Sequence, residues 1–254
     1  MPIPTPPRRL PPDYSVTPSP DFDEQISAEF RLAVEIGWLQ RAIATRLERR
    51  PSLLLDLGCG SKRHYGLLAD SVVGVDLDVE ALQSNRSLTR AITADVSHYD
   101  PGTEIYDVVA CWNVLEHIRE PTSMIIRMSN ALKTGGLLIL AFPNVASPRG
   151  LITRLTPTFI HRAARRHILG IRDSGPFPTA FQRAHHPTRL LTVANEVRLK
   201  PIHIRAYEGY YERRLREVHP TGYKVWNAVG FVLSMISFGR IDQRSDVLVA
   251  FEKS

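Results

Sequence analysis

The chain has 254 residues, enough for one large α/β domain with a substantial buried core. Its hydrophobic fraction of 43% and charged fraction of 23% are those of an ordinary globular protein, which excludes a disordered or fibrous chain. The net charge of +6 is mild, so the positions of the charges are more informative than their sum.

The N-terminal segment is rich in proline. Residues 1–20 hold eight of the 19 prolines, and we expect residues 1–22 to form an extended, flexible arm. The arm lacks the apolar run of a signal peptide, and no part of the chain has the roughly 18 consecutive apolar residues of a transmembrane helix. These features predict a cytoplasmic protein whose residues 23–254 form a single domain.

The expected elements then follow in order. Apolar residues at steps of three and four predict a helix over residues 23–49. Apolar runs rich in branched residues predict strands at residues 52–56, 72–76, 91–94, 106–111 and 137–142. A helix is expected to begin at Pro121 and to be closed by Gly135 and Gly136. A helix over 187–197 and strands at 202–207 and 246–252 complete the pattern, which is typical of a mostly parallel sheet covered on both faces.

The motif LLLDLGCGSKRH, residues 53–64, carries the chemistry. The first strand leads into Gly58 and Gly60, and glycine at such a turn lets a ligand approach the backbone closely. A tight turn without a ligand is the alternative for this motif alone. Asp76, Asp95 and Asn113 then follow the second, third and fourth strands, where open α/β sheets bind their ligands.

These residue types suit a nucleotide-like ligand. Asp76 can accept hydrogen bonds from two ribose hydroxyls, and Asp95 can accept one from an adenine amino group beside the backbone N–H of Val96. Arg63 stands where a dinucleotide motif needs its third glycine, and no phosphate-binding G-K-[ST] follows the first strand. A ligand without a pyrophosphate therefore fits better than NAD.

Five segments covering residues 52–144 resemble the class I S-adenosylmethionine-dependent methyltransferases, particularly the small-molecule and ubiquinone-type O-methyltransferases. They are LLLDLGCG (53–60), VVGVDLD (72–78), ITADV (92–96), YDVVACWNVLEHI (106–118) and LKTGGLLILAFPN (132–144). The resemblance implies a Rossmann-like α/β fold with a seven-stranded sheet, mostly parallel, with helices on both faces and an antiparallel last strand between the fifth and sixth. Residues 23–254 would then be one methyltransferase domain.

The same resemblance implies that the cofactor is S-adenosyl-L-methionine. The residues expected to bind it are Asp56, Gly58, Cys59, Gly60, Asp76, Leu77, Asp95, Val96, Trp112 and Asn113. One departure from the family pattern is Lys62, which stands where the family often has a small residue.

Candidates for the chemical step are few. His117 in the segment LEHI is the candidate general base, with a packing or orienting role as the alternative. His185 and His186 are further candidates, although a solvated loop position is the simpler interpretation of both. The two cysteines, Cys59 and Cys111, are expected to be buried thiols, and no metal site is expected.

The acceptor is expected to bind under an insertion at residues 145–186, which carries seven arginines and a single acidic residue, Asp173. Guanidinium groups bind phosphate or carboxylate, so an anionic acceptor is predicted, against a simply solvated helix face as the alternative. The predicted substrate-binding residues are Arg162, Arg165, Arg166, Phe177, Phe181 and His185.

A second insertion, residues 222–240, is expected to be an apolar helix. Its stretch 225–238 lies between Lys224 and Arg240, and suits either a core or dimer contact or peripheral contact with the inner membrane surface.

We therefore expect O-methylation of an anionic small molecule or glycan, with a lipid-linked acceptor as one option. An RNA or DNA methyltransferase is disfavoured because residues 111–114 read Cys-Trp-Asn-Val, without the Asn-Pro-Pro-Tyr element of base methylation. A non-enzymatic partner subunit with this fold is the other alternative, and the sequence does not indicate the oligomeric state.

Overall fold

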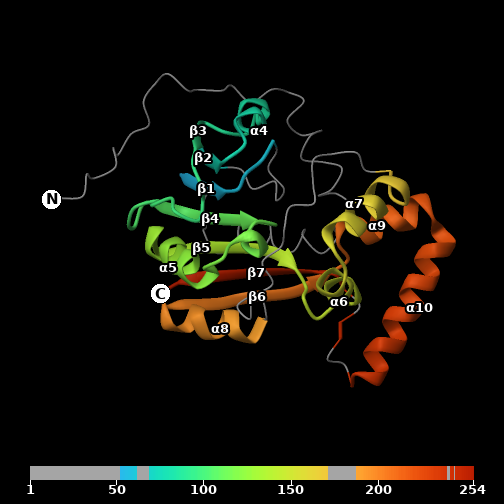
Figure 1. Cartoon of the computed structure of the whole chain (residues 1–254). Helices are drawn as coiled ribbons and strands as arrows, with labels where there is room; N and C mark the ends of the chain where they lie inside the picture. Colours follow the sequence, from blue (N-terminus) through green and yellow to red (C-terminus); the bar gives the residue numbers. More distant parts are fainter. Residues whose placement is uncertain (1–51, 62–68, 171–186, 239–240, 243) are drawn as a thin grey trace.

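Seven strands form one sheet in the computed structural model, which describes residues 52–61, 69–170, 187–238, 241–242 and 244–254. The strands are β1 (Leu53–Leu57), β2 (Ser71–Asp76), β3 (Arg90–Thr93), β4 (Tyr106–Trp112), β5 (Leu132–Pro143), β6 (Leu199–Tyr207) and β7 (Asp246–Lys253). Their order is β3-β2-β1-β4-β5-β7-β6, and β7 runs antiparallel to both of its neighbours. The predicted sheet, including the reversed last strand, is therefore confirmed (Figure 1). The predicted arm and the helix over 23–49 lie outside the described residues.

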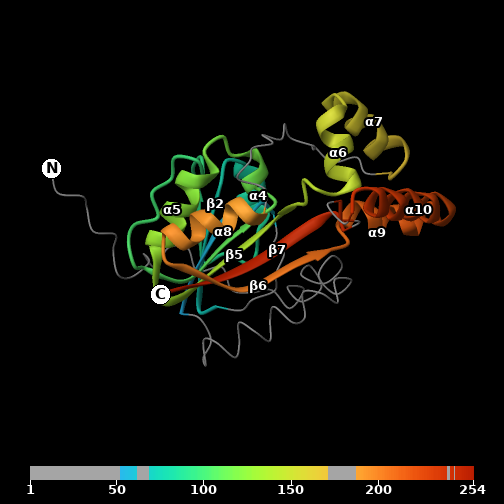
Figure 2. The ribbon, with the colours of Figure 1, turned by 90° about the horizontal axis from the view of Figure 1, so that it is seen from below.

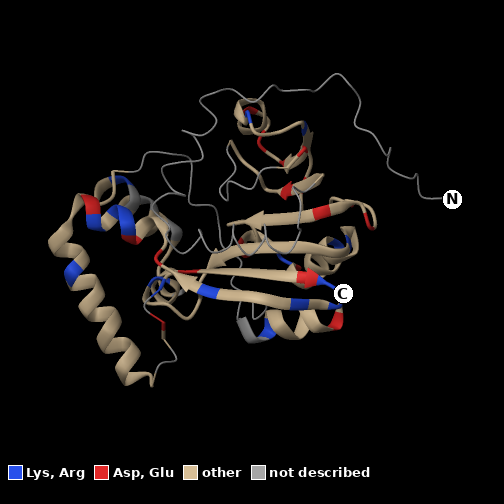
Figure 3. Cartoon of the chain, turned by 180° about the vertical axis from the view of Figure 1, so that it is seen from behind, with Lys and Arg blue, Asp and Glu red and all other residues tan. Residues whose placement is uncertain are grey.

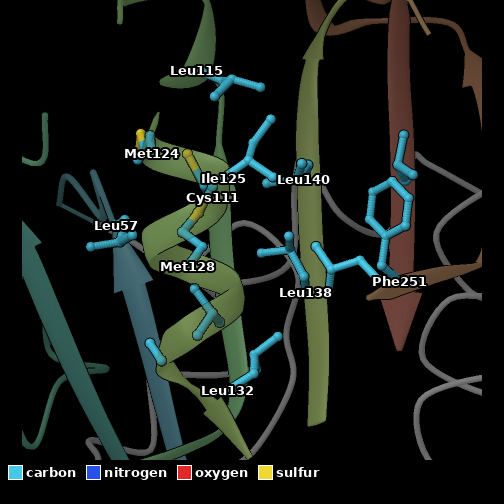
Figure 4. Close-up of a cluster of buried hydrophobic side chains, with 14 of the residues drawn as sticks. Leu57, Cys111, Leu115, Met124, Ile125, Met128, Leu132, Leu138, Leu140 and Phe251 are labelled. Atoms are coloured by element: carbon cyan, nitrogen blue, oxygen red, sulfur yellow. The ribbon is translucent and has the colours of Figure 1, made fainter. Parts of the chain in front are cut away.

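Helices cover both faces of the sheet, as predicted. On one face α5 (Pro121–Ala131) and α8 (Pro187–Glu196) pack against side chains such as Leu55 and Leu138. Figure 4 shows Met124, Ile125 and Met128 of α5 lying against the strands in this core. On the other face, Leu82 of the short helix α4 (Val79–Ser84) packs into a second core with Leu54 and Val108. Because both faces are buried, the strands read as continuous apolar runs.

The glycine pair Gly135-Gly136 does not close a helix, so that prediction was wrong. Helix α5 ends at Ala131, and both glycines lie within β5. The β4–β5 pairing shifts register between Tyr106 and Val108, and Gly135 has φ of +76°. Helix ends and bulged strands both use glycine at positive φ, so the sequence signal did not distinguish them.

One buried carboxylate fixes where the first strand begins. Asp107 in β4 accepts hydrogen bonds from the backbone N–H groups of Ser52 and Leu53, both at 2.9 Å. The Nζ of Lys133 also lies 3.0 Å from its Oδ1. Although burial opposes ionisation, these bonds hold the pKa of Asp107 below its usual value.

Four helices lie beyond the carboxyl ends of the parallel strands (Figures 1 and 2). They are α6 (Pro148–Leu155), α7 (Thr158–His167), α9 (Tyr210–Val218) and α10 (Pro220–Ile236). The first two belong to the predicted lid insertion, whose residues 171–186 lie outside the described part. Helix α10 corresponds to the predicted apolar helix, but begins at Pro220 rather than at 222. Among the helices described, none is long and apolar enough to cross a bilayer.

Candidate cofactor and acceptor site

The turn after β1 is held open by its two glycines. Gly58 and Gly60 have φ of +72° and +52°, a region that residues with a Cβ rarely adopt. The N–H of Gly58 donates to the carbonyl of Val75 at 2.7 Å, and a Cβ on Gly58 would lie 2.2 Å from Cγ2 of Val114. A Cβ on Gly60 would meet no atom of the described residues within 4 Å. Gly58 is thus required by packing, whereas no described residue fills the space beside Gly60, where a ligand could approach the backbone.

Asp76, at the end of β2, connects this turn to the next one. Its Oδ2 accepts a hydrogen bond from the N–H of Gly60 at 2.8 Å, and its Oδ1 accepts one from the N–H of Asp78 at 2.9 Å. An ionised carboxylate has about four lone-pair positions, so two remain for the hydroxyls of a ribose. Leu77 follows directly with 66% of its surface exposed, and can cover one face of a flat ring. The predicted neighbours Gly60, Asp76 and Leu77 therefore come together.

Asn85 supports the same turn and was missed by the sequence analysis. Its buried side-chain amide donates to the carbonyl of Gly60 at 3.0 Å, and lies 3.5 Å from that of Cys59. Its Oδ1 accepts a hydrogen bond from the N–H of Ser87 at 3.1 Å. The only local signal is that Asn85 is the C-cap of α4, and this gives no hint of a partner 25 residues away.

The residues predicted after β3 and β4 occupy three different environments. Oδ1 of Asp95 accepts hydrogen bonds from the hydroxyl and the N–H of Ser97, which lower the pKa of Asp95. Val96 and Trp112 are buried, at 9% and 7% exposure. Asn113 lies directly after β4, is exposed, and has a φ of +56°. Contacts of these residues with the cofactor remain predictions.

Asp56 and Cys59 are both buried, at 2% and 1% exposure. Burial, with a smaller contribution from the charges of Asp56 and Asp76, raises the pKa of the Cys59 thiol far above its usual value. Burial does the same for Cys111. The prediction of two buried thiols is confirmed. Within the described part of the chain, no three His, Cys, Asp or Glu side chains are grouped to hold a metal ion.

His117 lies at the end of a short 3₁₀ turn, Leu115–His117, directly after β4. Its side chain is 28% exposed, and its Nε2 is 3.8 Å from Oε1 of Glu116, which is too long for a hydrogen bond. Glu116 itself is buried, and its Oε2 has no hydrogen-bond partner among the described residues. Burial raises the pKa of Glu116 to about 8, and the charge of Asp246 contributes to this rise.

Close to Glu116, a cluster of charges joins α6 and α9 to the sheet. Nη1 of Arg149 lies 3.3 Å from Oδ1 of Asp246 and 3.8 Å from Oε2 of Glu212, and its guanidinium stacks 4.5 Å from the ring centre of Tyr211. Glu212 also accepts a hydrogen bond from the Ser245 hydroxyl at 2.6 Å. Arg149 was counted with the positive charges of the lid, but two carboxylates already neutralise it.

The other predicted acceptor residues are only partly described. Arg166 is exposed on α7, and Arg162 and Arg165 lie on the same helix, four residues and one residue before it. The side chains of Arg162 and Arg165 lie outside the described part of the structure. So do six whole residues, which are Phe177, Phe181, His185, His186, Lys62 and Arg63. Phe159 at the start of α7 is 69% exposed. The described part of the lid thus presents apolar and basic groups at the carboxyl end of the sheet.

A mostly parallel sheet with a reversed seventh strand, a glycine turn after β1 and a carboxylate after β2 define a class I S-adenosylmethionine-dependent methyltransferase. The methyltransferase domain family matches residues 28–191, and the chain belongs to that family. S-adenosyl-L-methionine is the cofactor of this class, and hence of this enzyme.

Relatives of known function include ubiquinone biosynthesis O-methyltransferases. The protein from Pectobacterium atrosepticum is 31% identical over 149 residues, which cover 46% of this chain and 60% of the relative. The one from Xanthomonas euvesicatoria pv. vesicatoria is 33% identical over 119 residues, which cover 40% of this chain and 47% of the relative. The chain thus spans about half the length of the curated relatives it matches.

Solved structures show the same fold at low sequence identity. An S-adenosylmethionine-dependent methyltransferase from Archaeoglobus fulgidus superposes with a TM-score of 0.53 at 18% identity, covering 91% of this chain and 98% of that one. The geranyl diphosphate C-methyltransferase of Streptomyces coelicolor superposes with a TM-score of 0.54 at 15% identity, covering 93% and 83%. At such identities the similarity concerns the fold alone.

Proposed function

We propose that this enzyme transfers the methyl group of S-adenosyl-L-methionine to a hydroxyl oxygen of a small molecule. The observation that carries the proposal is the backbone at Gly60, uncovered by any described residue, beside the carboxylate of Asp76, which accepts two hydrogen bonds from described N–H groups and can accept two more. The matched regions of the ubiquinone-biosynthesis relatives, which are O-methyltransferases by name, support oxygen as the methylated atom.

Different residues of the chain would bind different parts of the cofactor. The backbone of Gly58 to Gly60 would take the methionine end, the carboxylate of Asp76 the ribose hydroxyls, and the exposed side chain of Leu77 the adenine ring. Asp95 and Val96 would contact the adenine edge. When bound, the cofactor supplies a methyl group activated by a sulfonium, so the protein mainly has to align the acceptor and exclude water.

A hydroxyl acceptor must lose its proton as its oxygen gains the methyl group. The imidazole of His117, partly exposed after β4, would accept that proton. We expect His117→Ala to lower kcat while leaving cofactor binding unchanged, and His203→Ala on β6 serves as the matched control. Equal kcat values for both variants would assign His117 to packing instead.

The acceptor itself is proposed to carry a phosphate or carboxylate group, as a small molecule or a saccharide, including a lipid-linked one. The support is the basic helix α7, whose segment 161–167 holds three arginines and no acid. A panel of small hydroxyl acceptors with and without a phosphate or carboxylate substituent tests this directly. Arg166→Glu should raise the KM of the anionic acceptors only, and Lys200→Glu, on the exposed side of β6, should not.

The whole proposal depends on cofactor binding. Isothermal titration of the full chain with S-adenosyl-L-methionine should show one site, and with NAD none. Absence of binding to S-adenosyl-L-methionine would refute the proposal, whereas binding without turnover of any hydroxyl acceptor would refute only the acceptor assignment.

A further inference from the structure

Helix α10 (Pro220–Ile236) exposes an unusually apolar surface. Val225, Val229, Val232 and Ile236 recur at steps of four, three and four, so they form one row along the helix. Phe231 and Met235, four residues apart, form a second row, and Phe238 follows just beyond the end of the helix. All seven side chains are exposed, from 46% at Val229 to 94% at Phe238. Contiguous apolar surface of this kind marks an interaction site.

The opposite side of α10 is already engaged. Tyr223 donates its hydroxyl to Oε1 of Glu208 at 2.6 Å, and the guanidinium of Arg216 in α9 lies 5.4 Å from the Tyr223 ring centre. Gly230, on this side, is buried. Figure 1 shows α10 leaving the end of α9 at an angle and running along the outer side of the molecule, beyond α6 and α7. The two apolar rows therefore face outward from a helix that is anchored on its inner side.

The one charged side chain within α10 is basic, whereas the acidic Glu217 lies just before the helix and Asp242 just after it. Residues 218–241 contain no acidic residue, and the exposed Lys224 is the basic residue within α10. Figure 3 shows α10 with one basic segment and no acidic one. Helix α7, at the same end of the sheet, carries three arginines in the segment 161–167. A partner that covers the apolar rows must therefore accommodate the positive charge of the exposed Lys224.

We propose that the outer face of α10 docks on the surface of a bilayer containing anionic phospholipids. A second copy of the chain would bring the same positive charges together, whereas anionic headgroups complement them. Seventeen helical residues span about 25 Å, which is short of a hydrocarbon core of about 30 Å, so the helix lies in the interface rather than across it. This inference does not depend on the proposed reaction.

The test is co-sedimentation of the full chain with lipid vesicles. Vesicles of phosphatidylcholine containing about one quarter phosphatidylglycerol should retain the protein, and vesicles of pure phosphatidylcholine should retain much less. The double substitution Phe231→Glu with Val232→Glu should lower the partition coefficient about tenfold or more. Ile126→Glu, at a comparably exposed apolar position on α5, is the matched control and should bind as the wild type does.

Circular dichroism and titration with S-adenosyl-L-methionine confirm that each variant is folded, and Met235→Ser provides a milder change if the double variant is not. Failure of the wild type to sediment with either kind of vesicle overturns the proposal, as does equal sedimentation of wild type and folded variant. A dimer in size-exclusion chromatography that the variant dissociates would overturn it in favour of a second copy. None of these outcomes alters the calorimetric test of the proposed reaction.

Discussion

Replacing Asp76 by alanine should separate cofactor binding from the support of the glycine turn. The wild-type carboxylate accepts hydrogen bonds from the N–H groups of Gly60 and Asp78, at 2.8 and 2.9 Å. It would also accept two from the ribose of S-adenosyl-L-methionine. Alanine removes all four acceptor functions, so we expect a modest loss of stability and a large loss of cofactor affinity.

The magnitude follows from the number and exposure of these bonds. A hydrogen bond to a charged group contributes about 1.5–3 kcal/mol, and two to the ribose together contribute about 3 kcal/mol or more. The affinity should therefore fall by roughly 100-fold or more. The bond to Gly60 is partly buried and the bond to Asp78 is exposed, so the expected loss of unfolding free energy is smaller, about 1–2 kcal/mol.

Calorimetric titration measures the affinity, and urea unfolding measures the stability. Asn85→Ala is the matched control, because it removes a support of the turn at the carbonyl of Gly60 without removing a proposed ligand group. We expect Asn85→Ala to lower stability at least as much as Asp76→Ala, with a far smaller effect on affinity. The reasoning is refuted if Asp76→Ala binds within about threefold of wild type, or if both variants lose affinity equally.

Three further predictions concern two buried carboxyl groups and the glycine turn. The pKa of Glu116 is raised to about 8 in the folded chain, so the folded state binds more protons than the unfolded state between about pH 5 and 8. The free energy of unfolding therefore falls with rising pH in this range, by at most about 1.4 kcal/mol per pH unit. Urea unfolding should find Glu116→Gln more stable than wild type at pH 8.5, and the difference should shrink at pH 5.5. The pKa of Asp107 is lower in the folded chain, so its carboxylate stabilises the fold at pH values above its unfolded-state pKa. This stabilisation is lost as the pH falls through the folded-state pKa. In thermal melts, the Tm of Asp107→Asn should therefore depend less steeply on pH in the acid range than that of wild type. Gly58→Ala places a Cβ 2.2 Å from Val114 Cγ2 at a φ of +72°, so it should lower Tm. Adding Val114→Ala should restore part of the loss. A Tm of Gly58→Ala equal to that of wild type would contradict this packing.

The sequence was most informative where the signal is local. A buried strand that runs into Gly58 and Gly60 and a second one that ends at Asp76 are patterns within a few residues, and the structure brings them together as predicted. Parallel strands align their carboxyl ends by geometry, so the local signals were sufficient to predict their proximity. The position of the reversed strand β7 came from the family resemblance and not from its own residues.

What the sequence did not reveal depends on contacts between distant segments. Arg149 pairs with Asp246, 97 residues away, and neither residue carries a pattern that indicates the other. Likewise, the amide of Asn85 reaches back across 25 residues to the turn at Gly60. Hydrophobic periodicity places an element against a core, but it does not determine which polar side chains meet when the elements pack.

The pairing of Arg149 changes where an anionic acceptor can be held. Around it lie three carboxyl groups, those of Glu116, Glu212 and Asp246, and a second buried guanidinium, that of Arg213. Burial raises the pKa of Glu116 to about 8 and that of Asp246 to about 6, and the carboxyl groups of this cluster offset the charges of the two guanidiniums. Arg149 therefore offers little net positive charge to an acceptor, and we assign the proposed anion contact to α7. Removing the buried guanidinium in Arg149→Met should cost about 3 kcal/mol of stability, whereas Arg166→Met should leave stability unchanged and raise the KM of an anionic acceptor. Unfolding and steady-state kinetics on both variants measure this division, and the opposite pattern would show that Arg149 rather than α7 holds the acceptor.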